Sequence, residues 1–202
     1  MKVVVTPPRT IPAPEAQEAK YAAWVEITLV IQLRVPDWGV DEVVFAHWAM
    51  PWEGEASAGG WRRFDPGARA ARPSAPLGVP EVTLNPERAK ALVDEVRALV
   101  PRRLHRQPAL GMVSQFGEEL GSFRHRCLRA FAPSVQQGLL RRDPQAARAV
   151  AQMVDGIETR ELTAEEGAFL EARVGLAYYP QGVEPRLLPD RLMVEGGKGW
   201  QA

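Results

Sequence analysis

The feature that most constrains this chain is the alternation of apolar and polar side chains between residues 21 and 35. Every second position from residue 25 is apolar, and polar residues such as Glu26 and Arg34 stand between them. A period of two places successive side chains on opposite faces of an extended chain, so the pattern predicts a half-buried strand. Turn residues at 36–39 and a second apolar run at 43–50 extend this prediction to a β-hairpin.

Three later segments are predicted to be helices. Asn85-Pro86 joins an N-cap side chain to a proline at the first helical position, and Asp143-Pro144 repeats the combination. The third helix is expected at about 118–132, where Pro133 interrupts it. The positions predicted to face the core recur every three or four residues. They are Ala89, Leu92, Val93, Val96, Leu99 and Val100, then Phe123, Cys127, Leu128 and Phe131, then Ala147, Val150, Ala151 and Val154.

The order of these elements predicts the fold class. Residues 108–114 are expected to form a short strand, and residues 157–163 and 168–179 a second pair of strands. Strands followed by helices and then by strands again are typical of an α+β fold. We expect an antiparallel sheet built from an N-terminal and a C-terminal strand pair, with three or so helices packed on one side.

Proline and glycine suggest the boundaries of this domain. Four prolines make residues 1–20 an extended arm, and residues 21–180 are expected to form a single domain. Within it, residues 53–80 are rich in Gly, Ala, Pro and Arg and predict a long loop. Residues 181–202 form a Pro- and Gly-rich tail.

The chain is expected to be cytoplasmic and to have no membrane segment. Its single cysteine, Cys127, cannot form an internal disulfide, which fits a reducing compartment. The N-terminal apolar run is too short for the core of a signal peptide. The longest apolar region, residues 24–35, is interrupted by charged residues and is shorter than a membrane helix.

Charge is balanced over the whole chain but not along it. The sequence has 25 basic and 25 acidic residues, yet residues 101–150 hold nine arginines and only three acids. Such asymmetry indicates either a binding face or two solvated surfaces of one fold. Because arginine serves both protein interfaces and nucleic-acid phosphates, either partner is possible. The arginines predicted to make this contact are Arg102, Arg103, Arg106, Arg124, Arg126, Arg129, Arg141 and Arg142.

No catalytic or metal-binding group of residues is recognised. The Gly-Gly-Lys at 196–198 lacks the Ser or Thr and the helix that a phosphate loop needs. His125 and Cys127 lie two apart on a predicted helix, so they point to different sides and do not converge on one ion. Packing is expected for Cys127 and for His47, which lies in a strand. The sequence therefore predicts no catalytic residue, no metal and no cofactor.

Several short segments, taken in order, resemble one family. These are bacterial HerA-type, FtsK-like ATPases of the helicase and translocase class, and the segments resemble the region that follows the ATPase core. Residues 40–53 resemble the strand "VDxWxxxxLLAPW", residues 64–68 the loop after it, residues 104–118 the stretch "L-x-R-x-PAL-x-x-x-S-x-x-GE", residues 123–127 "FR-x-RC" and residues 173–180 the closing strand. The long charged helix usual after "FR-x-RC" is replaced here by a segment broken at Pro133 and Pro144.

The resemblance implies a module without its motor. Neither a Walker A motif nor an acidic Walker B strand occurs, so the nucleotide-binding residues of the family have no counterparts here. It implies a non-catalytic accessory or assembly module that associates with a HerA-type translocase ATPase or another protein partner. The alternative is a nucleic-acid-binding module that uses the Arg-rich segment 102–142. An enzyme of unfamiliar type would require a deep pocket lined by converging polar side chains.

Overall fold

The structure, a computed structural model, describes residues 1–13, 20–52, 60–67, 84–130, 137, 141–188 and 195–196. This part of the chain forms a large sheet, a small three-stranded sheet and three α-helices. The predicted α+β class is confirmed, because the large sheet is mostly antiparallel and combines strands from both ends of the chain. Among the described residues, none of the helices has the length and apolar character needed to cross a membrane.

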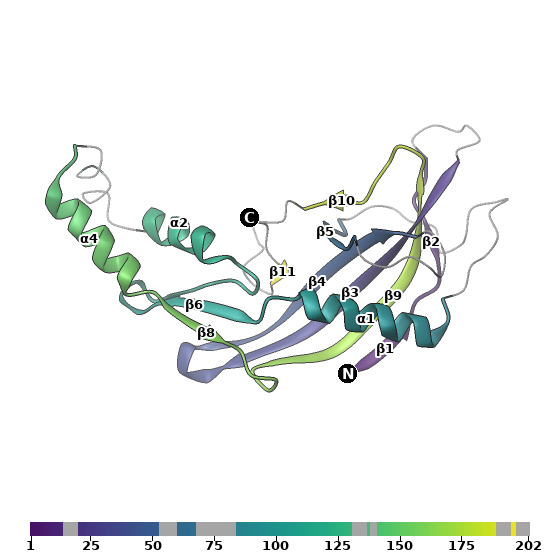
Figure 1. The fold of residues 1–202 in the computed structure, drawn as a ribbon, viewed down its shortest axis with the longest axis horizontal. Coiled ribbons are helices and arrows are strands. Elements are labelled where there is room, and N and C mark those ends of the chain that lie inside the picture. Colours follow the sequence, from purple (N-terminus) through teal and green to yellow (C-terminus); the bar gives the residue numbers. More distant parts are fainter. Residues whose placement is uncertain are drawn as a thin grey trace.

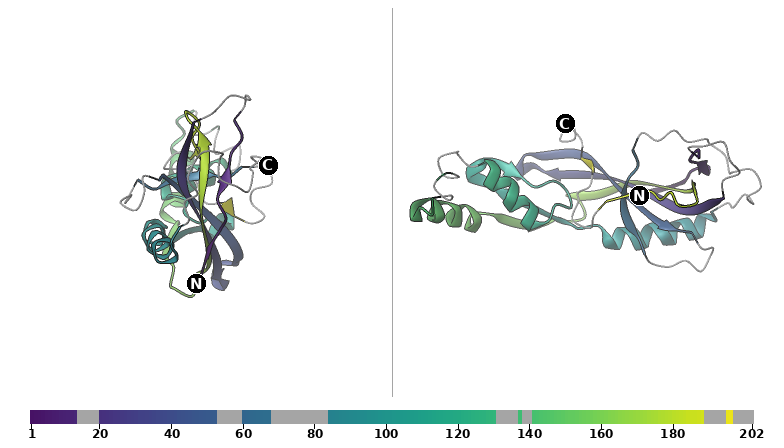
Figure 2. Two further views of the ribbon diagram at one scale, coloured as in Figure 1. Left: turned by 90° about the vertical axis from the view of Figure 1, so that its right-hand side faces the viewer. Right: turned by 90° about the horizontal axis from the view of Figure 1, so that it is seen from above.

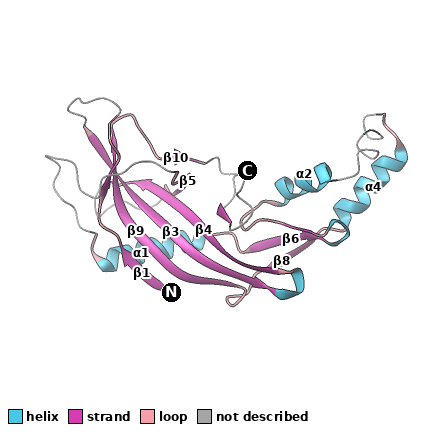
Figure 3. Ribbon diagram, turned by 180° about the vertical axis from the view of Figure 1, so that it is seen from behind, coloured by secondary structure: helices cyan, strands magenta, loops and turns pink. Residues whose placement is uncertain are grey.

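The large sheet has the strand order β1-β9-β3-β4-β5-β10, with β2 added to β9 and β11 added to β4. Its centre consists of three long antiparallel strands that run side by side in Figure 3. They are β3 (Tyr21–Val35), β4 (Val40–Pro51) and β9 (Gly167–Pro180). The shorter strands are β1 (Lys2–Val5), β2 (Arg9–Thr10), β5 (Arg62–Asp65), β10 (Arg186–Leu187) and β11 (Glu195–Gly196).

The hairpin of β3 and β4 follows the predicted pattern. β3 has the predicted bounds, and its apolar positions from Val25 to Val35 are fully buried on one face. The connection is a short 3-10 helix, η1 (Pro36–Trp38), which ends at Gly39. Gly39 has a φ of 70°, a left-handed conformation that glycine adopts without the steric cost of a side chain. β4 begins at Val40, three residues before the predicted start.

The helix α1 (Pro86–Leu99) covers one face of the large sheet. It lies in front of the sheet in Figure 1 and behind it in Figure 3. The Asn85 side chain accepts the N–H of Glu87 at 2.8 Å, so the predicted N-cap is confirmed. Leu99 is 48% exposed, and its predicted place in the core is wrong. The helix ends at Leu99, and the chain then becomes extended and buries Val100 instead.

The second group of elements is called the small lobe. It contains the sheet β7-β6-β8, whose strands are β6 (Arg103–Gln107), β7 (Met112–Val113) and β8 (Glu158–Glu161). The helices α2 (Leu120–Ala130) and α4 (Pro144–Asp155) and the 3-10 helix η2 (Pro108–Leu110) complete it. Phe123, Cys127 and Met153 form its core. Gln107 of β6 donates to the carbonyl of Met153 on α4 and accepts the N–H of Ala109 in η2. This side chain therefore joins β6 to α4 and to η2.

The predicted inward face of α4 is partly wrong. The buried residues are Ala146 and Met153, whereas Ala147 and Ala151 are exposed. Alanine is too small to decide which way a helix faces, and the large Met153 side chain sets its rotation against Phe123 and Cys127. The predicted N-cap is confirmed, because the Asp143 carboxylate accepts the N–H of Gln145 at 2.8 Å. Phe131, predicted to lie in the core, is outside the described residues.

The predicted C-terminal strands pair with different sheets. β8 pairs with β6, and β9 pairs with β3, so the two do not form a hairpin together. The sequence did not indicate β6, which supplies β8 with a partner. Residues 108–114, predicted to be a strand, form η2 and the two-residue β7. Within the segments predicted as loop and tail, residues 62–65 form β5, and β10 pairs with it. Residues 53–59, 68–80, 189–194 and 197–202 of these segments are outside the described residues.

The molecule is elongated, with α2 and α4 at one end (Figure 2). The small lobe is fixed to the end of the β3–β4 hairpin. The Asp37 carboxylate accepts a hydrogen bond from Arg160 at 2.7 Å, and its backbone carbonyl accepts one from Arg106 at 3.2 Å. Leu104 of β6 and Leu162, which follows β8, are buried in the same core as the inward face of α1. These contacts position the two helices of the lobe away from the large sheet.

Candidate functional site

The face of the large sheet opposite α1 carries polar side chains in rows that cross the strands. Thr28 on β3 lies opposite Arg173 on β9 and His47 on β4. The next row on the same face has Glu26 opposite Gly175. Because alternate residues of a strand share a face, these side chains belong to one surface, which is called the open face.

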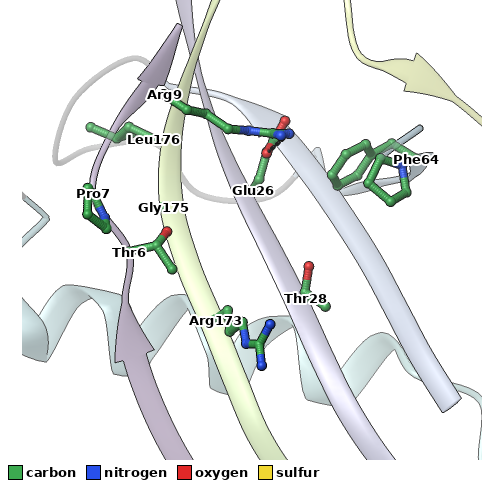
Figure 4. Close-up of a pocket in the computed structure, with 10 residues that line it drawn as sticks. Thr6, Pro7, Arg9, Glu26, Thr28, Phe64, Arg173, Gly175 and Leu176 are labelled. Carbon is green, nitrogen blue, oxygen red and sulfur yellow. Dashed lines mark hydrogen bonds and ion pairs between the residues drawn. The ribbon is translucent and has the colours of Figure 1, made fainter. Parts of the chain in front are cut away.

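A pocket of about 300 Å³ lies on the open face (Figure 4). β3 and β9 form its floor. Thr6 and Pro7 of the N-terminal segment form one wall, and Phe64 of β5 forms the opposite wall. Pro66, which follows β5, also lines the pocket. This volume is at the lower end of the range for small-molecule sites. The pocket is therefore large enough for a compact ligand.

Glu26 holds the polar end of the pocket together. The Arg9 guanidinium donates to one of its carboxylate oxygens, and the Tyr179 hydroxyl donates to the other at 2.6 Å. The Glu26 side chain is only 12% exposed. Burial of a carboxyl group is costly unless it is hydrogen-bonded, and these two contacts supply its partners. Glu26 thereby fixes the direction of the Arg9 side chain (Figure 4).

The neighbouring row contains His47, Thr28 and Arg173. Thr28 Oγ1 lies 3.0 Å from His47 Nδ1. The His47 ring stacks on Phe45 and meets the ring of Phe64 edge-on, with centroids 5.9 Å apart in the second case. These contacts confirm the prediction that His47 is packed, and they place it beside the pocket.

Arg173 is held by an acid on its own strand. Its Nε donates to Glu171 at 2.7 Å, and this hydrogen bond lowers the pKa of the Glu171 carboxyl below its usual value. The charge of Lys2, which lies opposite Glu171 on β1, acts in the same direction. The Arg173 side chain remains 58% exposed. Its guanidinium is thus both oriented and accessible.

Gly175 allows the N-terminal segment to approach β9. Thr6 donates its backbone N–H to the carbonyl of Val174 at 2.8 Å. A Cβ at position 175 would lie 2.2 Å from Thr6 Oγ1, which is far closer than atoms can pack. The missing side chain therefore lets Thr6 lie close against β9 and form a wall of the pocket.

Two of the arginines predicted to bind a partner form hydrogen bonds within the fold. Arg102 donates to the carbonyls of Thr163 and Gly167. Arg126 donates to Glu118 at 2.7 Å and to the carbonyl of Val113 at 2.8 Å. Because these guanidiniums satisfy internal acceptors, their removal is expected to affect stability.

The other predicted arginines differ in exposure. Arg103 forms an exposed ion pair with Glu161, and Arg106 binds the hairpin end. The remaining four are exposed on α2 and in the turn before α4. The structure therefore does not gather all eight side chains into one site. The four exposed arginines are Arg124, Arg129, Arg141 and Arg142.

The remaining chemistry-bearing residues are packed or isolated. Burial lowers the pKa of His105, whose Nδ1 lies 2.9 Å from the Thr159 hydroxyl. Cys127 is buried, and burial raises the pKa of its thiol, which disfavours the reactive thiolate. His125 is exposed on α2. Among the described residues, no three His, Cys, Asp or Glu side chains converge on a possible cation position.

The open face was not predicted as a site. The alternation in residues 21–35 places Glu26 and Thr28 on one polar face, which is a usable signal. Arg9, His47 and Arg173, however, come from three other strands. Only the strand register brings these five side chains together.

Comparisons of this chain with models of protein families, with curated proteins and with solved structures found no match. The resemblance to HerA-type ATPases therefore stays a prediction. A function has to be inferred from the geometry of the chain's own residues.

Proposed function

We propose that this chain is a non-catalytic accessory or assembly module that binds a protein partner through the outer end of the small lobe. The resemblance of its short segments to the post-motor region of HerA-type ATPases suggests a translocase ATPase as the partner. A cytoplasmic location is part of the proposal, since such a motor works there.

The observation that carries the proposal is the group of exposed arginines on α2 and before α4. Arg124, Arg141 and Arg142 are exposed and make no ion pair with any described residue. Arg129 is exposed on the same helix as Arg124. Arginine is enriched at protein interfaces because its planar guanidinium offers several hydrogen bonds and stacking contacts. The two helices stand at the end of the elongated molecule, where a partner can reach them (Figure 1).

The aromatic residues of the small lobe favour protein over single-stranded nucleic acid. Sites for single strands use exposed rings on which bases stack. Phe116 and Phe123, which lie among the arginines in the sequence, are buried. The described part of the lobe thus offers charge without the stacking surface of such sites.

A copurification experiment tests the proposal. A tagged chain expressed in its native host is expected to recover a motor ATPase in a constant ratio. The double variant Arg124→Glu with Arg141→Glu should reduce that recovery at least tenfold, by analogy with the loss of a few kcal/mol at interface arginines. Arg126 is left unchanged because it supports Glu118.

The matched control is Arg62→Glu, an exposed arginine on the large sheet, which should leave recovery unchanged. Repeated recovery of neither an ATPase nor any other protein would refute the proposal. Equal recovery by the double variant would refute the role of this surface.

The alternative partner, nucleic acid, is supported by the same exposed arginines. Phosphate contacts release counterions, so such binding would weaken steeply with salt. A gel-shift titration of the wild type and the double variant, with single- and double-stranded DNA, checks this. Absence of binding to both at low salt would eliminate the alternative, whereas recovery of the ATPase after nuclease treatment would support the protein partner.

A further inference from the structure

We propose that the pocket on the open face binds a small organic anion. Its carboxylate or phosphate would bind the terminal nitrogens of Arg173, and its apolar part would lie between the walls of the pocket. This site is distinct from the arginine surface of the small lobe and does not depend on the proposed function.

The first support is the donor groups that the pocket leaves unused. Arg173 uses Nε for Glu171, and its two terminal nitrogens have no acceptor among the described residues. Arg9 uses one terminal nitrogen for Glu26 and has no other acceptor in this part of the chain. A guanidinium presents its donors in a planar fork that matches the two oxygens of a carboxylate or phosphate.

The second support is the position of Arg173 on the floor of the pocket. Arg173 lies opposite Thr28, and Figure 4 draws its guanidinium beside the Thr28 side chain. An oxyanion bound to the terminal nitrogens of Arg173 therefore has the Thr28 hydroxyl on the same floor. The Arg9 guanidinium, bound at Glu26 in the next row, adds a second positive charge to the pocket.

The third support is the balance of charge. Among the residues that line the pocket, Arg9 and Arg173 are cations and Glu26 is the single acid, so one positive charge is in excess. Both oxygens of Glu26 are already occupied, one by Arg9 and the other by Tyr179. The pocket therefore favours an anion over a cation.

The fourth support is the apolar lining. Pro7 and Phe64 belong to the two walls above the charged floor, and Pro66 also lines the pocket. A small apolar wall with a few directed polar groups is the usual composition of a ligand site. The pocket volume of about 300 Å³ accommodates an anion with a single ring.

An NMR titration of the ¹⁵N-labelled full-length protein tests the proposal. The probes are benzoate, phenyl phosphate and inorganic phosphate, with benzyl alcohol and benzylamine as neutral and cationic controls. Benzoate or phenyl phosphate should produce saturable shifts of the Thr28, Arg173 and Gly175 amides with a millimolar Kd. Arg173→Gln should weaken that binding by roughly tenfold, the effect of losing hydrogen bonds to a charged group.

The matched control is Arg34→Gln. Like Arg173, Arg34 is an exposed arginine on a long strand and forms an ion pair with an acid, which is Asp41. It does not line the pocket. This variant should bind the probes like the wild type. Arg173→Lys, which keeps the charge and loses the fork, should bind more weakly than the wild type.

Three results would overturn the proposal. They are no saturable shift with benzoate or phenyl phosphate, equal binding of benzyl alcohol, and unchanged affinity in a well-folded Arg173→Gln protein. The copurification result is independent of each, so a failure here leaves the proposed partner surface unaffected.

Discussion

Glu42 is an acidic residue on the face of β4 that is otherwise buried against α1. It shares that face with Val44, and it lies opposite Leu33 on β3. Burial raises the pKa of its carboxyl above the usual value. Desolvation of the charged form therefore opposes folding at neutral pH.

We expect Glu42→Gln to raise the thermal unfolding temperature at pH 7. Because the folded-state pKa is above the unfolded one, the penalty is present above the folded pKa and disappears below the unfolded pKa. The difference in Tm between variant and wild type should therefore shrink as the pH falls. Glu119→Gln, at an exposed position, is the control, and a lower Tm for Glu42→Gln at pH 7 would contradict the expectation.

Gly175 provides a second prediction at the scale of one residue. Gly175→Ala places a Cβ against Thr6 Oγ1, so the Thr6 side chain or the N-terminal segment must shift. We expect a loss of about 1–3 kcal/mol in the free energy of unfolding, as for other overpacked sites. Urea denaturation measures it.

A compensating variant makes this test specific. Thr6→Ala removes the clashing oxygen, and the next Thr6 atom, its Cβ, is at an ordinary distance of 3.5 Å. The double variant should recover part of the lost stability. If the two effects simply add, the close approach is not the cause.

Within the small lobe, α2 is attached to its sheet by an ion pair. Glu118 precedes the helix and is 1% exposed in its side chain. Arg126, on the second turn of the helix, donates to both of its carboxylate oxygens and to the carbonyl of Val113 on β7. Its guanidinium also lies over the Phe123 ring, with Cζ 5.2 Å from the centroid. The arginine thus joins the helix, the loop before it and the sheet.

We expect Arg126→Met to destabilise the protein by about 2 kcal/mol, because a buried carboxylate loses its charged partner. Arg124→Met, on the exposed side of the same helix, should change stability very little. Chemical denaturation of the two variants provides the comparison. Equal stability of both would show that the ion pair contributes nothing measurable.

The different roles of two arginines on α2 illustrate what the sequence could and could not predict for one helix. Arg124 and Arg126 are near neighbours of one sequence motif, yet one is exposed and the other supports the fold. Helical periodicity separates their directions, but only the position of Glu118 shows that Arg126 has a buried partner.

At the scale of the whole molecule, Asp37 connects the large sheet to the small lobe. A hydrogen bond from its own backbone and one from Arg160 lower the pKa of its carboxyl. Arg160 also donates to Glu166 near the start of β9. The end of the hairpin, β8 and β9 therefore meet at one charged cluster.

We expect Asp37→Asn to loosen the small lobe on the large sheet. Amide hydrogen exchange in β6 and β8 should become faster at pH 7, while exchange in β3 and β9 stays slow. Asp41→Asn, on the same hairpin and exposed, is the control. Uniform change across the whole chain, or none, would contradict the expectation.

The same contact has a defined pH dependence. A depressed folded-state pKa means that the stabilisation is present above the unfolded pKa, about 3.9 for aspartate, and is lost as the pH falls through the folded value. The difference in Tm between wild type and Asp37→Asn should accordingly vanish in acid. A difference that persists in acid would show that the carboxylate charge is not responsible.

The sequence alone determined the local elements. The alternation in residues 21–35 predicted β3 to the residue, and Asn85 and Asp143 marked two helix starts, because these signals act between residues that are close in the chain. The tertiary structure decided how the elements pair. In the tertiary structure β8 pairs with β6, and Arg9, Glu26 and Arg173 line one pocket. Periodicity states which face of a strand is buried, but register and partner depend on the combined packing of distant segments.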